Sequence, residues 1–168
     1  MPPRSEQKPR SAKDGPIRAE EALSDRQREL DGGLYAATLE QQEECFARAF
    51  ARGDLEIARP LYHPDVVYLS PTVRLFDWPA RIEGVEHTLE FIALTIRGCQ
   101  RIVYRAVEHA ITPDGASAFV RIHFDWTRDA QRLRSNYVVI YRYREGLIGQ
   151  QELYYDPSGR LDQLGERH

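Results

Sequence analysis

The chain from residue 101 onward is dominated by four strand-like runs, and this feature most constrains the fold. Apolar and polar residues alternate within each run, which is typical of a β-strand with one buried face. Turn signals separate the runs at Pro113-Asp114-Gly115, near Asp129-Ala130 and at Glu145-Gly146. The runs are RIVYRAVEHAIT (101–112), SAFVRIHFDWT (117–127), SNYVVIYRY (135–143) and IGQQELYYD (148–156). Four strands joined by short turns predict an antiparallel sheet.

Helical patterns come before these strands. Within residues 34–54, apolar side chains occur at helical spacing and the helical pattern stops at Gly53; the apolar set is Leu39, Cys45, Phe46, Ala49 and Phe50. Residues 55–62 predict a second, short helix and residues 84–96 a third. Residues 66–70 predict a strand, and residues 73–82 a loop. Helices followed by a run of antiparallel strands predict an α+β domain.

The two ends of the chain have little apolar content. Residues 1–16 are rich in Pro, Lys, Arg and Ser and predict a disordered tail, and residues 17–30 predict at most a weakly packed helix. We therefore expect an N-terminal tail over residues 1–33, one folded domain over 34–160 and a C-terminal tail over 161–168.

Composition excludes several classes of partner and cofactor. A net charge of −3 gives no basic excess for nucleic acid, and no apolar run suits a membrane span or a signal peptide. Cys45 and Cys99 lack metal-ligand spacing, and the two lysines, Lys8 and Lys13, lie in the tail, which argues against Schiff-base chemistry. We expect a cytoplasmic protein with no cofactor, no nucleic-acid partner and no membrane partner.

The run FVRIHFDWTR (119–128) is open to two interpretations. As a strand it puts an apolar set on one face and a charged set on the other: Val120, Ile122, Phe124 and Trp126 against Arg121, His123 and Asp125. Apolar strand faces generally turn toward the core. By this rule the apolar set is buried and the charged set faces solvent. In the alternative the charged set lines a pocket.

Three short motifs occur in a distinctive order. They are Gly53-Asp54 after the first helix, His63-Pro64-Asp65 before the first strand, and Gly146-Leu147-Ile148 with Tyr154-Tyr155-Asp156 at the end. Over roughly residues 34–160 the chain resembles the SnoaL-like branch of the nuclear transport factor 2-like superfamily. The resemblance implies a cone-shaped α+β fold, in which a curved, mostly antiparallel sheet wraps about three N-terminal helices and encloses a pocket. This fold hosts many unrelated activities, so the function stays open.

The resemblance argues against ketosteroid isomerase activity. The positions of that enzyme's catalytic tyrosine, general base and oxyanion-binding acid correspond to Phe46, Ser70 and Val138 here. None of these side chains can shuttle a proton between carbons at neutral pH.

The register of limonene epoxide hydrolase bears on the open question of the strand face. Its Arg-x-Asp pair falls on Arg121 and His123, and its second aspartate falls on Leu153. This register implies that the charged set points into the pocket. The apolar face would then point outward, where so much apolar surface would not remain in contact with water. The resemblance implies that a homodimer buries this face, with its centre at Phe124, Trp126, Tyr141 and Tyr143.

The inward interpretation gives a coherent candidate site. His123 would act as general acid or base, Asp125 would orient its ring, and Arg121 would hold a ligand oxygen. The other pocket residues expected from the register and the adjacent loop are Tyr68, Ser70, Trp78, Val138, Gln151 and Tyr155. The ligand expected is a small, largely apolar molecule such as a polyketide or terpenoid. Two functions follow: cofactor-free acid–base catalysis of the cyclase, isomerase, dehydratase or epoxide hydrolase type, or a non-catalytic binding or association domain.

Overall fold

The computed structural model describes residues 38–128 and 130–156. The predicted tails, the weak helix over 17–30 and both predicted domain boundaries lie outside these residues and stay predictions. Among the helices in the described ranges, none is long and apolar enough to cross a membrane.

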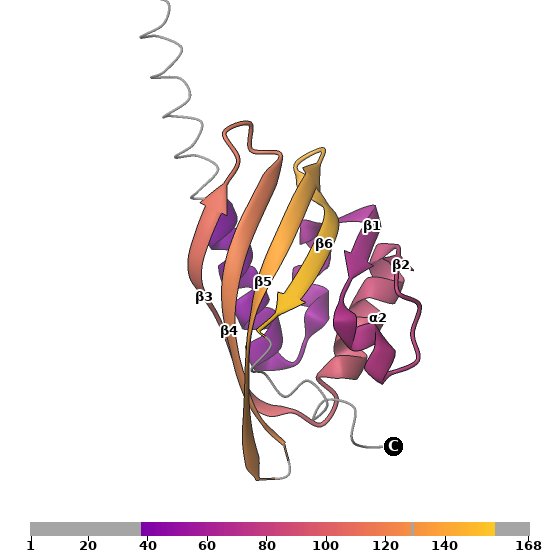
Figure 1. Ribbon diagram of the computed structural model, residues 1–168, viewed down its shortest axis with the longest axis vertical. Helices are drawn as coiled ribbons and strands as arrows, with labels where there is room; N and C mark the ends of the chain where they lie inside the picture. Colours follow the sequence, from indigo (N-terminus) through magenta and orange to yellow (C-terminus); the bar gives the residue numbers. More distant parts are fainter. Residues whose placement is uncertain (1–37, 129, 157–168) are drawn as a thin grey trace, which may run out of the picture.

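Six strands form one sheet in the order β2-β1-β6-β5-β4-β3 (Figure 1). Only the β1–β6 pair is parallel; the other neighbouring pairs are antiparallel. The strands are β1 (Tyr62–Leu69), β2 (Ile82–Glu83), β3 (Gln100–Ile111), β4 (Ser117–Arg128), β5 (Gln131–Arg144) and β6 (Leu147–Tyr155). The predicted α+β fold with a mostly antiparallel sheet is confirmed.

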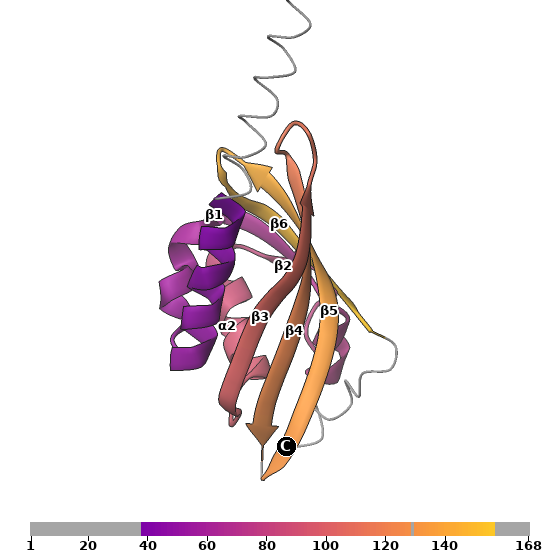
Figure 2. The same ribbon diagram turned by 90° about the vertical axis from the view of Figure 1, so that its left-hand side faces the viewer.

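Two α-helices cover one side of this sheet. The first spans residues 38–52 and buries Leu39, Phe46, Ala49 and Phe50; it stops at Gly53, whose φ of 64° favours glycine. The second, α2 (Val85–Thr95), buries Thr88, Leu89, Phe91 and Ile92. Figure 2 shows both helices on the same side of β3–β5. The core therefore lies between the helices and the inner sheet face.

The structure differs from the predicted elements between residues 55 and 83. The second helix is the 3-10 helix η1 (Leu55–Leu61), because Pro60 lacks the N–H that an α-helical turn would need. Strand β1 begins at Tyr62 rather than Val66. The predicted loop over 73–82 overlaps a second 3-10 helix, η2 (Pro71–Leu75), which Ser70 caps, and the start of the short β2.

The apolar face of β4 forms part of the core. Val120 and Ile122 are fully buried, and Phe124 and Trp126 are 7% and 3% exposed. Phe50 of the first helix packs on Phe124, with ring centroids 5.2 Å apart. Of the two interpretations of this strand, the structure therefore supports the one with the apolar set inside.

Candidate ligand-binding cavity

A small cavity lies between the first helix, α2 and the inner face of the sheet. Its volume is about 50 Å³, enough for a few water molecules or a compact organic group. Nine of the sixteen described residues that line it are aromatic: Phe46, Phe50, Tyr62, Tyr68, Tyr104, Phe124, Trp126, Tyr137 and Tyr155. The others are Ile92, Thr95, Ile96, Cys99, Ser135, Gln151 and Leu153. None of these sixteen carries a carboxylate, imidazole, ammonium or guanidinium group.

Tyrosine hydroxyls supply much of the polarity of the cavity wall. The Tyr62 hydroxyl donates to Gln151 Oε1 at 2.6 Å. Burial raises the pKa of Tyr155 to about 12, and burial also raises the pKa of Tyr68 and of Tyr137 well above the usual range. These phenols are therefore neutral at physiological pH. In that state they can donate hydrogen bonds but cannot serve as general bases.

One buried carboxylate lies just behind the wall. Glu43 of the first helix accepts a hydrogen bond from the Tyr104 hydroxyl at 2.6 Å and another from the Gln42 side chain at 3.1 Å. Burial raises the pKa of Glu43 in spite of these hydrogen bonds, which act to lower it. Glu43 is not itself a lining residue. It acts on the cavity through Tyr104, which is one.

The prediction that Arg121 and His123 line the pocket is wrong. Both side chains project from the outer face of β4, opposite Val138 and Asn136 of β5. The Arg121 side chain is 58% exposed and lies 3.8 Å from the Glu108 carboxylate, while His123 Nδ1 is 2.9 Å from Asn136 Oδ1. Neither residue borders the cavity, so the structure gives neither one access to a ligand bound there.

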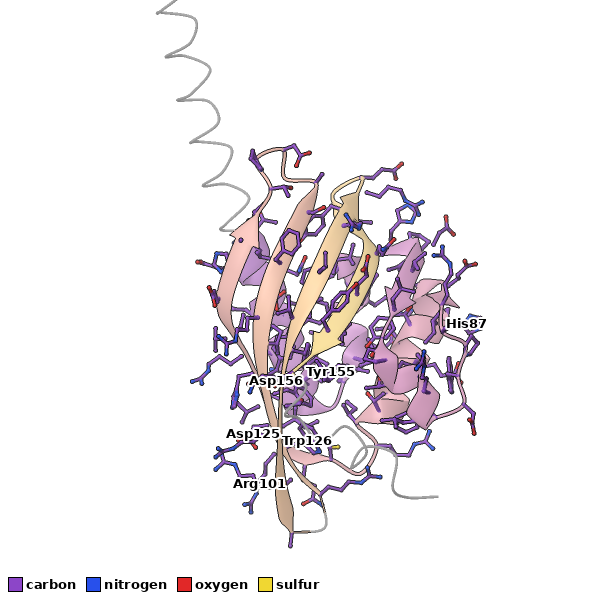
Figure 3. The ribbon with its side chains drawn as sticks, in the orientation of Figure 1. His87, Arg101, Asp125, Trp126, Tyr155 and Asp156 are labelled. Atoms are coloured by element: carbon purple, nitrogen blue, oxygen red, sulfur yellow. The ribbon has the colours of Figure 1, made fainter. Side chains whose placement is uncertain are left out.

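Asp125 is also on the outer face, although its side chain is nearly buried. Figure 3 shows Asp125 and Trp126 on opposite sides of β4. The guanidinium of Arg132 donates to both carboxylate oxygens, at 3.1 Å to Oδ1 and 2.8 Å to Oδ2 from Nε, and Arg134 lies 3.8 Å away. The hydrogen bond from Arg132 lowers the pKa of Asp125, so this carboxylate is ionised and paired. It does not orient His123 toward the cavity, and the predicted catalytic arrangement of the three residues is wrong in its placement.

Three of the six expected ligand contacts do line the cavity: Tyr68, Gln151 and Tyr155. Ser70 is buried behind them, where its hydroxyl caps η2 and lies 2.8 Å from the Thr72 hydroxyl. Trp78 packs on Phe91 outside the cavity, with ring centroids 5.2 Å apart. Val138 is on the outer face and 37% exposed. The expectations for Trp78 and Val138 are therefore wrong.

The predicted centre of a homodimer lies inside the subunit. Phe124, Trp126 and Tyr141 are buried, and Tyr143 is packed against the core with its hydroxyl donating to Gln42 at 3.1 Å. Phe124, Trp126 and Tyr141 therefore cannot form a subunit interface in this fold. One mistake, the exchange of the inner and outer faces of β4 and β5, led both to the wrong dimer centre and to the wrong placement of the charged residues.

The most important cavity residues that the sequence prediction missed are aromatic. They are Phe124, Trp126 and Tyr137 on the sheet, with Phe46 and Phe50 on the first helix and Tyr62 and Tyr104 on two further strands. Plain alternation along residues 119–128 does point to Phe124 and Trp126, because it puts the apolar face inward. No group of three or more His, Cys, Asp and Glu side chains suited to a metal ion occurs among the described residues.

The cone-like sheet, its two covering helices and the enclosed aromatic cavity define the class of protein. The SnoaL-like domain family matches residues 43–150. The chain therefore belongs to the SnoaL-like family, and the predicted resemblance is confirmed. Among curated proteins, no sequence matches significantly.

Solved structures show the same fold at low sequence identity. TsrD from Streptomyces laurentii is 21% identical with a TM-score of 0.61, covering 78% of this chain and 97% of TsrD. An NTF2-like protein from Burkholderia pseudomallei is 18% identical with a TM-score of 0.63, covering 76% and 97%. A ketosteroid isomerase-like protein from Catenulispora acidiphila, solved in complex with trimethylamine, is 16% identical with a TM-score of 0.58, covering 73% and 90%.

Proposed function

We propose that this protein binds a compact, largely apolar small molecule in the aromatic cavity, as a binding domain rather than an acid–base enzyme. The observation that carries the proposal is the composition of the wall: nine aromatic residues and no ionisable acid, base or cation among the sixteen described lining residues except phenols and one thiol. A general acid or base must lie within hydrogen-bond reach of the reacting atom. His123 and Asp125, the two groups expected to serve, lie across the sheet from the cavity.

The size of the cavity limits the size of the ligand that can bind there. A volume of about 50 Å³ suits a single small ring or a short branched chain better than a polycyclic molecule. A protein of this fold solved with trimethylamine, a ligand of four heavy atoms, supports small-ligand binding on this scaffold. We therefore favour a ligand much smaller than a polyketide.

Filling the cavity should abolish binding. Ser135 is a small lining residue of β5, and its neighbour Asn136 projects to the other face. Ser135→Leu should fill the space and reduce the affinity for one-ring ligands at least tenfold, whereas Asn136→Leu should leave it within about twofold. The thermal shift caused by a panel of one-ring compounds measures this, because a ligand at ten times its Kd stabilises the native state by about 1.4 kcal/mol. Equal binding by both variants would show that the ligand site is elsewhere.

A second proposal concerns association through the outer face of the sheet. The exposed apolar side chains of that face include Phe119 (41%), Val138 (37%) and Tyr154 (57%). Val138 is paired with Tyr154 on β6, and Phe119 lies two positions from Arg121, the β4 partner of Val138, so the three are neighbours. We propose that a second copy of the chain covers this patch.

Val138→Asp should then convert the protein to a monomer without unfolding it, because the new carboxylate would be desolvated only in the dimer. Light scattering should give twice the chain mass of 19.4 kDa for the natural sequence at micromolar concentration, and one chain mass for the variant. Glu90→Asp, a change of an exposed α2 residue on the other side of the molecule, should leave the dimer intact. A natural chain that is monomeric at this concentration contradicts the proposal.

A further inference from the structure

The indole N–H of Trp126 is a buried donor without an acceptor. Trp126 is 3% exposed and its ring forms part of the cavity wall. Within residues 38–128 and 130–156, no atom accepts a hydrogen bond from its Nε1. Buried donors in native proteins nearly always have a partner, so an orphan in a cavity wall marks a place where a bound molecule would be stabilised.

Other polar groups of the wall are engaged. The hydroxyls of Tyr62 and Tyr104 donate to Gln151 and Glu43. The hydroxyl of Thr95, another lining residue, donates to the Ile92 carbonyl oxygen at 2.7 Å. Two other buried hydroxyls of the core, those of Thr88 and Tyr141, also lack a partner among the described residues, but neither residue lines the cavity, whereas Trp126 does.

The chemistry of the indole group restricts its partner. Tryptophan Nε1 can only donate, so the partner must present a lone pair. An anion is disfavoured, because none of the described lining residues is a cation and the Glu43 carboxylate lies behind Tyr104. A carbonyl oxygen fits best, because it accepts a hydrogen bond and has no proton to donate. A hydroxyl group would also need an acceptor for its own proton.

We propose that the cavity recognises a compact neutral carbonyl compound, whose oxygen accepts a hydrogen bond from Trp126 Nε1 while its hydrocarbon part lies among the aromatic rings. Phe124, with its ring centroid 5.1 Å from that of Trp126, and Phe50, 5.2 Å from Phe124, supply apolar surface beside the donor. This inference rests on the proposed binding function and adds the ligand class and the residue that selects it.

Two probes of nearly identical shape test the inference. Cyclohexanone presents a carbonyl oxygen where methylenecyclohexane presents a CH₂ group that accepts no comparable hydrogen bond. Cyclohexanone should bind about fivefold more tightly, the value expected of one net hydrogen bond. The chain has two tryptophans, so the indole region of a ¹⁵N-labelled sample contains two N–H signals. The Trp126 signal should move downfield with the ketone and not with the alkene.

Two variants provide the controls. Trp126→Phe removes the donor, identifies its signal and should make the two probes bind equally. Trp78→Phe, outside the cavity, should keep the preference for the ketone. If the two probes bind the natural protein equally and the Trp126 signal does not move downfield with the ketone, the inference is wrong while the proposed binding function stands. If neither probe binds and the panel of one-ring compounds gives no thermal shift, both are wrong. The comparison of probes on the natural protein decides the matter even if Trp126→Phe folds poorly.

Discussion

Shortening Ile122 to alanine should lower the free energy of unfolding by about 2–5 kcal/mol, the usual cost of deleting this much side chain from a packed core. Ile122 is fully buried on the inner face of β4, between Val120 and Phe124. The neighbouring substitution His123→Ala should change the free energy by no more than about 1 kcal/mol, because His123 is half-buried on the outer face and loses one contact, with Asn136. The two variants differ by one position and test directly which face of the strand is core.

Chemical denaturation of the two variants measures the effect, since the midpoint shifts while the slope stays that of the natural protein. A large loss for His123→Ala with a small loss for Ile122→Ala would mean that the strand faces the other way. Such a result would return the charged residues to the cavity, and with them the acid–base interpretation. Ligand binding measured on His123→Ala adds a second readout, which should be unchanged.

The fold could be predicted because its signals are local and repeated. Helical spacing in residues 38–52 and 85–95 and alternation in β3–β6 each appear in the sequence several times over, and the turn residues separate them. Helical spacing, strand alternation and turn residues all predict the same fold, and such agreement is the condition under which a sequence specifies one structure. The prediction missed only the short irregular elements around Pro60 and within residues 71–83, where a few residues determine the local structure.

The face of β4 could not be predicted from the family register, and a single extra residue explains why. In the β5–β6 hairpin Tyr143 pairs with Ile148, but Arg142 pairs with Gln150, so Gly149 is an extra residue in β6. A β-bulge of this kind shifts every later pairing by one position, which exchanges the two faces of the partner strand. A glycine is suited to this position, because a Cβ there would lie 3.0 Å from the Cβ of Arg144.

The bulge decides which β5 residues share a face with β6. Gln151 lies opposite Tyr141, and Leu153 opposite Val139. In an unbulged hairpin the same β6 residues would lie opposite Ile140 and Val138. The sequence prediction put Gln151 and Val138 on the same inner face, as an unbulged hairpin would, and the family register put Arg121, which pairs with Val138, on that face as well. An isolated glycine inside a strand pattern is a known sign of a bulge, so Gly149 was a second local signal, beside the alternation of residues 119–128, that could have corrected the site.

The rest of the cavity depends on contacts that no local pattern reveals. The Tyr104 hydroxyl and Glu43 are 61 residues apart in the chain, and the Tyr62 hydroxyl and Gln151 are 89 residues apart. Each residue alone is an ordinary tyrosine, glutamate or glutamine in an amphipathic element. The cavity exists only because the sheet brings β1, β6, β5 and β4 side by side under the first helix (Figure 1).

Glu43 should make the stability of the protein fall as pH rises above the usual range of a glutamate. Burial raises the pKa of Glu43 in the folded state above the ordinary glutamate value of 4.5, which applies to the unfolded chain. Well below pH 4.5, Glu43 is protonated in both the folded and the unfolded protein, so its ionisation does not lower the free energy of unfolding. Above it the unfolded chain releases the proton while the folded protein keeps it, so unfolding becomes more favourable until the pH passes the raised pKa. The slope within this window is at most about 1.4 kcal/mol per pH unit.

Glu43→Gln should remove this dependence, and Glu44→Gln, the same change at the exposed neighbouring position, should not. Denaturant unfolding of the three proteins from pH 4 to pH 9 measures it. The quantity to follow is the free energy of unfolding of the natural protein minus that of Glu43→Gln, because a fixed loss of hydrogen bonds to Tyr104 or Gln42 then cancels from the trend. A positive charge on His109 favours ionised Glu43, so repeating the comparison in a His109→Gln background separates the contribution of that residue. A difference that stays flat or rises with pH would show that Glu43 is not held protonated in the fold. Tyr104 donates to Glu43 and also lines the cavity, so ligand affinity should change over the same pH window in the natural protein and not in Glu43→Gln.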